Sequence, residues 1–446
     1  MTYKIFLYLL FIFLSLEFYL FPQDSTYHEA TDTEFIIVDS IFIVGTDVTE
    51  DEIILRELTF SIGDTVSNKQ LLYNQDRIFS LGIFTKVQLL PSAVENSHGN
   101  LIIYVEESWY FYPLPVVAIR DRDWKKFSYG FDLVLQNFRG RNEVIRARSV
   151  FGYDPAFLMS YYNPYLIWED NIFFRADFQY RNEANRSSIA KYLHGGDFSQ
   201  KFISSSFAIG KRLGIYHRIS TGFGFNYTET PFYIPGISVS DGRIDRFFSL
   251  MLGYSYDSRD LAQFPKNGVY ASAGIQLKGF GVHNINYQIL NLDFREYRPI
   301  IGDLIAKWRF STRHAVGGQV PYNDFSFIGY SERIRGHFYQ VSEGHHSYIG
   351  LLEFSYPVIK DINISLDFIP ILPKELLSYR VALYSQLFGD TGATKMKESK
   401  LSLNDFNSGF GTGLTLLILP YSILRIEVGF DGDFNSEWIF DLGVSF

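Results

Sequence analysis

Hydrophobic and polar residues alternate along most of this chain, in segments of roughly ten residues that follow one another from about Pro113 to Phe446. Side chains of a β-strand point to opposite faces in turn, so a period of two predicts strands with one apolar and one polar face. Short turns, such as 137–142 and 263–268, alternate with longer polar loops between the segments. We count about sixteen segments, an even number, which predicts an antiparallel sheet closed into a barrel.

The last segments show which face of each strand is apolar and which is polar. One face of the final segment carries only aromatic and aliphatic residues, namely Trp438, Phe440, Leu442, Val444 and Phe446. In a transmembrane β-barrel the apolar faces contact lipid and the polar faces line the lumen. Parity also predicts that Glu353 and Asp390 face the lumen, because Leu352 and Leu387 lie at odd spacing from them on the apolar faces.

The composition favours the same class of protein. Aromatic residues make up 18% of the chain, with 43 Phe and 31 Tyr. After the N-terminus, no uninterrupted apolar run approaches the ~20 residues of a membrane helix. The net charge of −9 offers no argument for nucleic-acid binding. The absence of cysteine excludes disulfides, a lipid-modified N-terminal cysteine and cysteine-ligated metals.

The N-terminal residues carry a different pattern. Lys4 and the apolar run 5–14 predict a secretory signal peptide at 1–23. No small-residue cleavage site marks its end, so a retained membrane anchor is the alternative. Residues 35–107 then show strand and helix signals in the order β-α-α-β-β, which predicts a small α+β domain.

Two capping patterns place the helices of this small domain. Thr49, with Glu52 three residues later, predicts a capping box at the start of the first helix. Ser67 predicts the start of the second helix, and Gly82 its end.

Candidate chemistry gathers in the long polar segment between Gly317 and Gly344. A strand-rich chain rarely needs so long a connection merely to reverse direction. The segment contains Arg335, and the strands that follow it carry Glu353 and Asp390. This order predicts a loop that folds back and is held by charge-assisted hydrogen bonds, whereas a solvated loop arginine is the alternative.

No pattern indicates catalysis or a bound cofactor. The sequence contains neither a G-x-S-x-G nor an H-E-x-x-H motif. The glycines of 409–413 recur at a period of two within a strand, so they predict a smooth patch on the lumen wall. His345 and His346 lack further spaced ligands for a metal. We therefore expect no enzyme, no cofactor and no metal site.

Three stretches resemble the BamA/TamA outer-membrane assembly superfamily, also called the bacterial surface antigen family. They are Ile334-Arg335-Gly336, Leu352-Glu353-Phe354 and Phe388-Gly389-Asp390-Thr391-Gly392. In that family an Ile/Val-Arg-Gly-aromatic tip of the sixth extracellular loop reaches into the barrel and meets acidic residues on its wall. The resemblance implies a site made of Ile334, Arg335, Gly336, Glu353, Phe388, Asp390 and Gly392. His337 departs from the pattern, because it stands where the family usually has an aromatic residue.

The small N-terminal domain resembles a polypeptide-transport-associated (POTRA) domain, present in one copy. The resemblance is carried by Ile43-Val-Gly-Thr, Arg56-Glu57, Ile62-Gly-Asp and Leu81-Gly-Ile-Phe. In the family this domain lies in the periplasm and holds extended client chains along a strand edge. Such β-augmentation relies on main-chain hydrogen bonds and demands no particular client sequence.

We therefore expect a POTRA domain at 35–107 and a transmembrane barrel at 111–446, in the outer membrane of a Gram-negative bacterium. The resemblance implies an assembly factor that receives unfolded outer-membrane proteins and inserts them into membrane lipid at a seam between the first and last strands. Pro113 and Pro115 lack backbone donors, which suits an edge strand. The expected seam residues are Pro113, Pro115, Val117, Leu442, Val444 and Phe446.

The alternative function is a polypeptide-translocating or solute-conducting outer-membrane barrel. The single POTRA copy weakens the general assembly role, because family members with that role generally carry several. It also leaves open whether accessory periplasmic or lipoprotein factors are partners.

Overall fold

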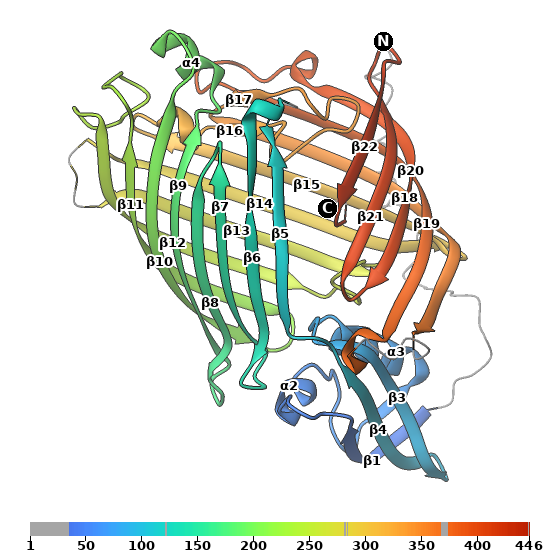
Figure 1. Cartoon of the computed structure of the whole chain (residues 1–446). Helices are drawn as coiled ribbons and strands as arrows, with labels where there is room; N and C mark the ends of the chain where they lie inside the picture. The colour runs from blue at the N-terminus through green and yellow to red at the C-terminus, as the bar shows by residue number, and fades with distance from the viewer. Residues whose placement is uncertain (1–34, 121–122, 281, 283, 367–372, 445) are drawn as a thin grey trace.

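The computed structural model describes residues 35–120, 123–280, 282, 284–366, 373–444 and 446. The signal peptide expected at 1–23 lies outside these residues. The described chain forms a small N-terminal domain and a large antiparallel sheet that curves round a lumen (Figure 1). Within the described residues, no helix is long and apolar enough to cross a membrane.

The N-terminal domain contains one more strand than the sequence pattern predicts. Its elements are β1 (Phe35–Val44), α2 (Asp51–Leu55), β2 (Thr65–Ser67), α3 (Asn68–Phe79), β3 (Phe84–Glu95) and β4 (His98–Glu107). They form a sheet in the order β2-β1-β4-β3, with β1 and β4 parallel. The additional strand β2 is three residues long and pairs with the start of β1.

The two expected helix caps have different outcomes. Ser67 forms the capping box of α3 together with Gln70. Thr49 does not cap α2, whose N-cap residue is Glu50. The Thr49 hydroxyl donates instead to the carboxylate of Glu107, at 2.6 Å. The same carboxylate also accepts hydrogen bonds from the backbone N–H groups of Val48 and Thr49.

The large sheet has sixteen antiparallel strands, which confirms the predicted fold class. Its strands are β5 (Phe111–Ile119), β6 (Phe127–Phe138), β7 (Glu143–Gly152), β8 (Ala156–Ile167), β9 (Ile172–Ala184), β10 (Ser199–Leu213), β11 (His217–Glu229), β12 (Ile244–Asp257), β13 (Gly268–Phe280), β14 (Tyr287–Ile301), β15 (Leu304–Gly317), β18 (His346–Ser365), β19 (Ser378–Lys395), β20 (Asn407–Leu419), β21 (Ser422–Phe430) and β22 (Ser436–Leu442). Each strand pairs with the next one in this series.

Short elements occupy the loops between these strands. They are helix α4 (Ser188–His194), strands β16 (Ser326–Ile328) and β17 (Ser342–Gly344), and the 3-10 turns η2 (Trp124–Lys126), η3 (Tyr322–Asp324), η4 (Lys374–Leu376) and η5 (Leu403–Asp405). Helix α4 lies at the end of the barrel opposite the N-terminal domain (Figure 1).

Strand parity separates the two faces of the sheet. On β19, Leu387 is 60% exposed on the outer face, whereas Asp390 is 1% exposed on the lumenal face. On β21, Ile426 is 48% exposed and its neighbour Glu427 only 1%. The outer face is therefore apolar and the lumenal face polar, as a transmembrane barrel requires.

The sheet ends in β5 and β22, and we call the boundary between these two strands the seam. No pairing joins β5 to β22 among the described residues. Of the expected seam residues, Pro113, Pro115 and Val117 lie on β5 and Leu442 lies at the end of β22.

Of the two remaining expected seam residues, Val444 follows the end of the last strand, whereas Phe446 lies in the lumen, so the assignment of Phe446 to the seam is wrong. The last strand ends at Leu442, and Gly443 turns the chain with a positive φ of 97°. Phe446 is 6% exposed and packs inside the barrel, where the Tyr297 hydroxyl donates to its backbone carbonyl at 3.2 Å. The physical reason is that the aromatic ring of Tyr297 and a lumenal aliphatic cluster bury the Phe446 ring.

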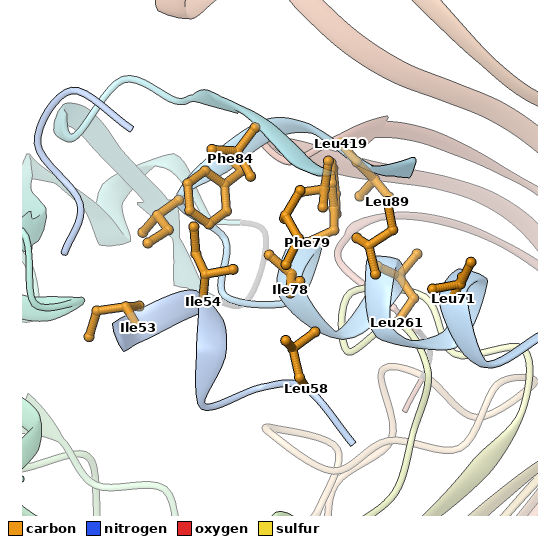
Figure 2. Close-up of a cluster of buried hydrophobic side chains, with 14 of the residues drawn as sticks. Ile53, Ile54, Leu58, Leu71, Ile78, Phe79, Phe84, Leu89, Leu261 and Leu419 are labelled. Atoms are coloured by element: carbon orange, nitrogen blue, oxygen red, sulfur yellow. The ribbon is translucent and has the colours of Figure 1, made fainter. Parts of the chain in front are cut away.

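The apolar core of the N-terminal domain continues into the barrel. Figure 2 shows Leu261 and Leu419 of the barrel beside Ile78 and Phe79 of α3. Leu261 lies in the turn between β12 and β13, and Leu419 ends β20. The domain is therefore packed against the adjoining end of the barrel.

A buried ionic cluster also joins the domain to the barrel, and we call it the domain joint. Its members are Glu57, Arg77, Tyr165 and Arg212. The Glu57 carboxylate accepts hydrogen bonds from Arg212 at 2.6 and 2.9 Å and from Arg77 at 2.6 Å. Burial opposes ionisation of Glu57, but the hydrogen bonds and charges of Arg212 and Arg77 outweigh it and hold the pKa of Glu57 below its usual value.

The domain contacts strands near both ends of the sheet. Glu50 pairs with Arg141, in the turn between β6 and β7, at 2.7 Å. Asp76 on α3 pairs with Arg380 on β19, also at 2.7 Å. The small domain therefore bridges the first and last parts of the sheet, on either side of the seam.

We predict that Glu57→Gln loosens the domain joint. The substitution leaves Arg77 and Arg212 facing each other without a carboxylate, and breaking a buried pair costs about 3–5 kcal/mol. Hydrogen–deuterium exchange should become faster in both 50–58 and 163–171. Glu50→Gln is the control, because its pair with Arg141 is about 40% exposed and such pairs contribute only about 0–1 kcal/mol. Unchanged exchange in Glu57→Gln would contradict a stabilising joint.

The same joint predicts a dependence on pH. A carboxyl group whose pKa is lowered on folding stabilises the folded state above its unfolded pKa, and this contribution is lost as the pH falls through the folded pKa. Docking of the native domain should therefore weaken below about pH 4.3, the ordinary pKa of glutamate. Exchange measured from about pH 7 down to about pH 3 should show this loss in the native protein and a smaller one in Glu57→Gln.

Candidate functional site

The long segment between β15 and β18 folds back into the lumen. Strands β16 and β17 pair within it, with Ser326 opposite Gly344. Residues 331–338 lie between these two strands, and we call them the loop tip. Ile334 is fully buried, and Arg335 and Phe338 are 4% and 7% exposed. The inner part of the loop tip therefore lies buried within the barrel, whereas Ser331 and Arg333 are exposed.

Arg335 meets both carboxylates that parity directs inward. Its Nε and Nη2 donate to the two oxygens of Asp390 at 2.7 and 2.8 Å, and its Nη1 donates to Glu353 at 3.1 Å. The guanidinium also stacks on the ring of Phe388, 3.7 Å from the centroid. This bidentate, charge-assisted geometry suits arginine and would not be reproduced by lysine.

Glycines make room for the loop tip against the wall. A Cβ at Gly392 would lie 2.8 Å from Cδ1 of Ile334. Gly336 has a φ of 94°, and a Cβ there would lie 2.5 Å from the carbonyl oxygen of Phe430. Ile334, Gly336 and Gly392 therefore fit together through close backbone approach.

Three further charged residues complete the cluster. Glu427 on β21 accepts from Arg335 at 2.9 Å and from Arg425 at 3.2 Å. Lys307 on β15 donates to Glu353 at 3.2 Å. Arg335, Lys307 and Arg425 thus balance the charges of Glu353, Asp390 and Glu427. Glu427 alternates with the exposed Ile426 on β21, but this alternation alone does not connect Glu427 with Arg335.

The terminal strand also holds the loop tip, through a residue that sequence reasoning missed. Oε1 of Glu437 on β22 accepts the backbone N–H groups of Gly336 and Phe338 at 2.8 and 2.7 Å. His337, which replaces the usual aromatic residue, places Nε2 3.2 Å from the carbonyl oxygen of Ser408. The period-two pattern puts Glu437 on the lumenal face but does not reveal this contact.

We call this arrangement the latch. In it, the guanidinium of Arg335 is held by carboxylates from three strands. Within the described part of the chain, no group of three or more His, Cys, Asp or Glu residues is arranged to hold a metal ion. The expected seam residues Pro113, Pro115, Val117 and Leu442 do not join this cluster, because they lie along β5 and at the end of β22. The latch and the seam are therefore separate features of one barrel.

We predict that Arg335→Ala releases the loop tip. Three lumenal carboxylates would lose their shared cation, which costs about 3–5 kcal/mol for a buried pair and about 1 kcal/mol where water screens it. The barrel should fold, unfold at a lower temperature, and expose the loop to chymotrypsin, whose sites after Tyr330, Phe338 and Tyr339 are present in both variants and in the native protein. Arg333→Ala is the matched control, because Arg333 is exposed and the contacts of its side chain among the described residues lie within its own loop. Equal chymotryptic protection of Arg335→Ala and the native protein would argue against the latch.

Comparisons with known proteins agree with this architecture. A surface antigen variable number repeat model, which describes POTRA domains, matches residues 36–108. BamA from Haemophilus ducreyi lacking POTRA domains 1–3 superimposes with a TM-score of 0.54 at 16% identity, covering 92% of this chain and 84% of that one. CdiB from Acinetobacter baumannii gives a TM-score of 0.46 at 13% identity, covering 92% of this chain and 73% of that one. At such identity, the likeness to BamA shows the fold alone.

The family assignment comes from the barrel. An Omp85 superfamily domain model matches residues 137–446, which is more than half of the chain. Together with the POTRA match, it confirms the resemblance that the sequence motifs indicate. The chain belongs to the Omp85 superfamily of outer-membrane proteins, whose members insert proteins into this membrane or translocate them across it.

Proposed function

We propose that this protein assembles other outer-membrane proteins, with a periplasmic POTRA domain at 35–107 and a membrane barrel at 111–446. Unfolded clients bind the POTRA domain and enter the membrane at the seam. The observation that carries this proposal is the seam itself: the sheet ends in β5 and β22, which do not pair among the described residues.

Backbone groups at such an edge need partners in lipid. Water is absent from the hydrocarbon layer, so unpaired N–H and C=O groups must be satisfied by protein. Pro113 and Pro115 contribute no N–H groups to β5, which makes that strand a poor permanent partner. Because the chain turns inward at Gly443, the paired part of β22 extends over only seven residues. An incoming client strand can supply the missing hydrogen bonds.

The POTRA domain is placed to deliver clients to this edge. Strand β3 ends the small sheet, and its Leu90 and Val94 are 46% and 51% exposed. An extended client can add to this edge through main-chain hydrogen bonds. The link from β4, which ends at Glu107, to β5, which begins at Phe111, is short, so a bound client lies close to the first seam strand.

This mechanism needs no catalytic residue and no cofactor. Its partners are membrane lipid and unfolded outer-membrane proteins, and accessory periplasmic or lipoprotein factors are a further class to test. The protein would lie in the outer membrane of a Gram-negative bacterium.

Translocation through the lumen is the second candidate function. The lumen wall is polar, and its buried Asp132 accepts from both Arg146 and Arg148. The loop tip lies inside this lumen, and the POTRA domain is packed against one end of the barrel. A translocated chain would require both to move, whereas insertion at the seam requires only that β5 and β22 part.

We predict that locking the seam abolishes client assembly. The sequence has no cysteine, so pairs can be scanned with one cysteine at 114–118 on β5 and one at 438–442 on β22. A disulfide forms only where the Cα atoms approach within ~7 Å. Cells with a cross-linked pair should lose assembly of outer-membrane proteins and regain it on reduction.

The matched control locks two strands that already pair. Ile426 on β21 lies opposite Phe440 on β22, so cysteines at these positions can cross-link without closing the seam. This control should leave assembly intact. If a locked seam assembles clients as well as the control, insertion at the seam is wrong and translocation through the lumen becomes the better account.

A further inference from the structure

The loop tip is fastened to the last strand of the sheet as well as to the interior wall. The backbone N–H groups of Gly336 and Phe338 converge on a single oxygen of Glu437, at 2.8 and 2.7 Å. Glu437 is the second residue of β22. Hydrogen bonds from backbone amides to a carboxylate are charge-assisted and stronger than neutral ones. This contact joins the latch to the strand that borders the seam.

Strand β22 has few other attachments. It pairs with β21 over seven residues, from Ser436 to Leu442, and no described residue pairs with its other edge. Trp438 and Phe440 point outward and are 60% and 70% exposed. On the lumenal side, Asp441 accepts from Arg425 at 2.7 Å. The position of β22 therefore depends on one neighbouring strand and on a few lumenal contacts.

The loop tip reaches β22 because the intervening strands present glycines. A Cβ at Gly409 on β20 would lie 2.0 Å from the carbonyl oxygen of Arg335. A Cβ at Gly429 on β21 would lie 2.7 Å from the backbone nitrogen of Gly336. Any other residue at these positions would lift the tip away from the wall. Gly409 and Gly429 thus let a loop that is anchored on β18 and β19 contact the terminal strand.

We propose that Glu437 is a positioning residue that couples the seating of the loop tip to the position of β22 at the seam. When Arg335 occupies its carboxylate cluster, the tip presents two backbone donors to Glu437 and holds β22 in place. When the tip leaves, Glu437 loses both donors and β22 becomes freer to move. Coupling of this kind is reciprocal, so a change in the seating of the loop tip must alter the mobility of β22, and a change in β22 must alter the seating of the loop tip. The functional consequence rests on the proposed role of the seam.

Three substitutions test the coupling in the full-length protein, in detergent micelles. Glu437→Ala removes the acceptor, and Glu437→Gln keeps one acceptor oxygen. Asp441→Ala is the matched control, because it removes a different lumenal contact of β22 and leaves Arg425 paired with Glu427. The readouts are tryptic cleavage in the loop tip and hydrogen–deuterium exchange of β22, both measured without any client.

We expect Glu437→Ala to increase tryptic cleavage in the loop tip by at least about tenfold, because two charge-assisted hydrogen bonds are lost and one of them alone produces a change of about that size. Glu437→Gln should restore most of the protection, and Asp441→Ala should leave the loop tip as protected as in the native protein. In the reverse direction, Arg335→Ala should speed exchange in β22, although the carboxylates that Arg335 pairs with among the described residues lie on β18, β19 and β21.

Two results would overturn the coupling. One is a loop tip in Glu437→Ala that is cleaved no faster than in the native protein. The other is native exchange in β22 when Arg335→Ala has released the loop. Because these readouts need no client, the coupling can fail while the locked-seam experiment succeeds, and the reverse.

Discussion

A guanidinium inside a barrel must be neutralised, and much of the lumenal architecture follows from this constraint. Desolvating a charge is costly unless opposite charges and hydrogen bonds surround it. Arg335 has such surroundings because β18, β19 and β21 each direct one carboxylate to the same point. Each of these strands must therefore keep its register, since a slip of one residue would turn its carboxylate toward lipid. The ionic contact thus fixes a loop and three strands at once.

The charge requirement also explains where glycine is found. The guanidinium can reach its partners only if the backbone of the tip lies almost directly on β20 and β21. Gly409 and Gly429 allow that approach, and Gly336 supplies the positive φ that turns the tip along the wall. A barrel with the same carboxylates but with bulkier residues in these strands would hold the arginine further away.

Alternation along the sequence predicted most of this arrangement. It gave the number of strands and the inward direction of Glu353 and Asp390, because both follow from local periodicity. The contacts of Glu57 and Glu437 could not be predicted, because they are not local in the sequence. Glu57 meets Arg212, 155 residues away, and Glu437 meets Gly336, 101 residues away. No local pattern encodes which lumenal or interdomain groups meet across such separations.

The last residues show where periodicity misleads. Val444 and Phe446 continue the apolar alternation of β22, and on that ground alone they belong to the outer face. Gly443, however, tolerates a positive φ, and the lumen offers an aromatic partner in Tyr297. A strand whose outer edge is unpaired has little to hold it straight, so a local turn with burial of one aromatic ring decides the path of the chain. The free edge that makes β22 useful at a seam is therefore also what allows its end to leave the sheet.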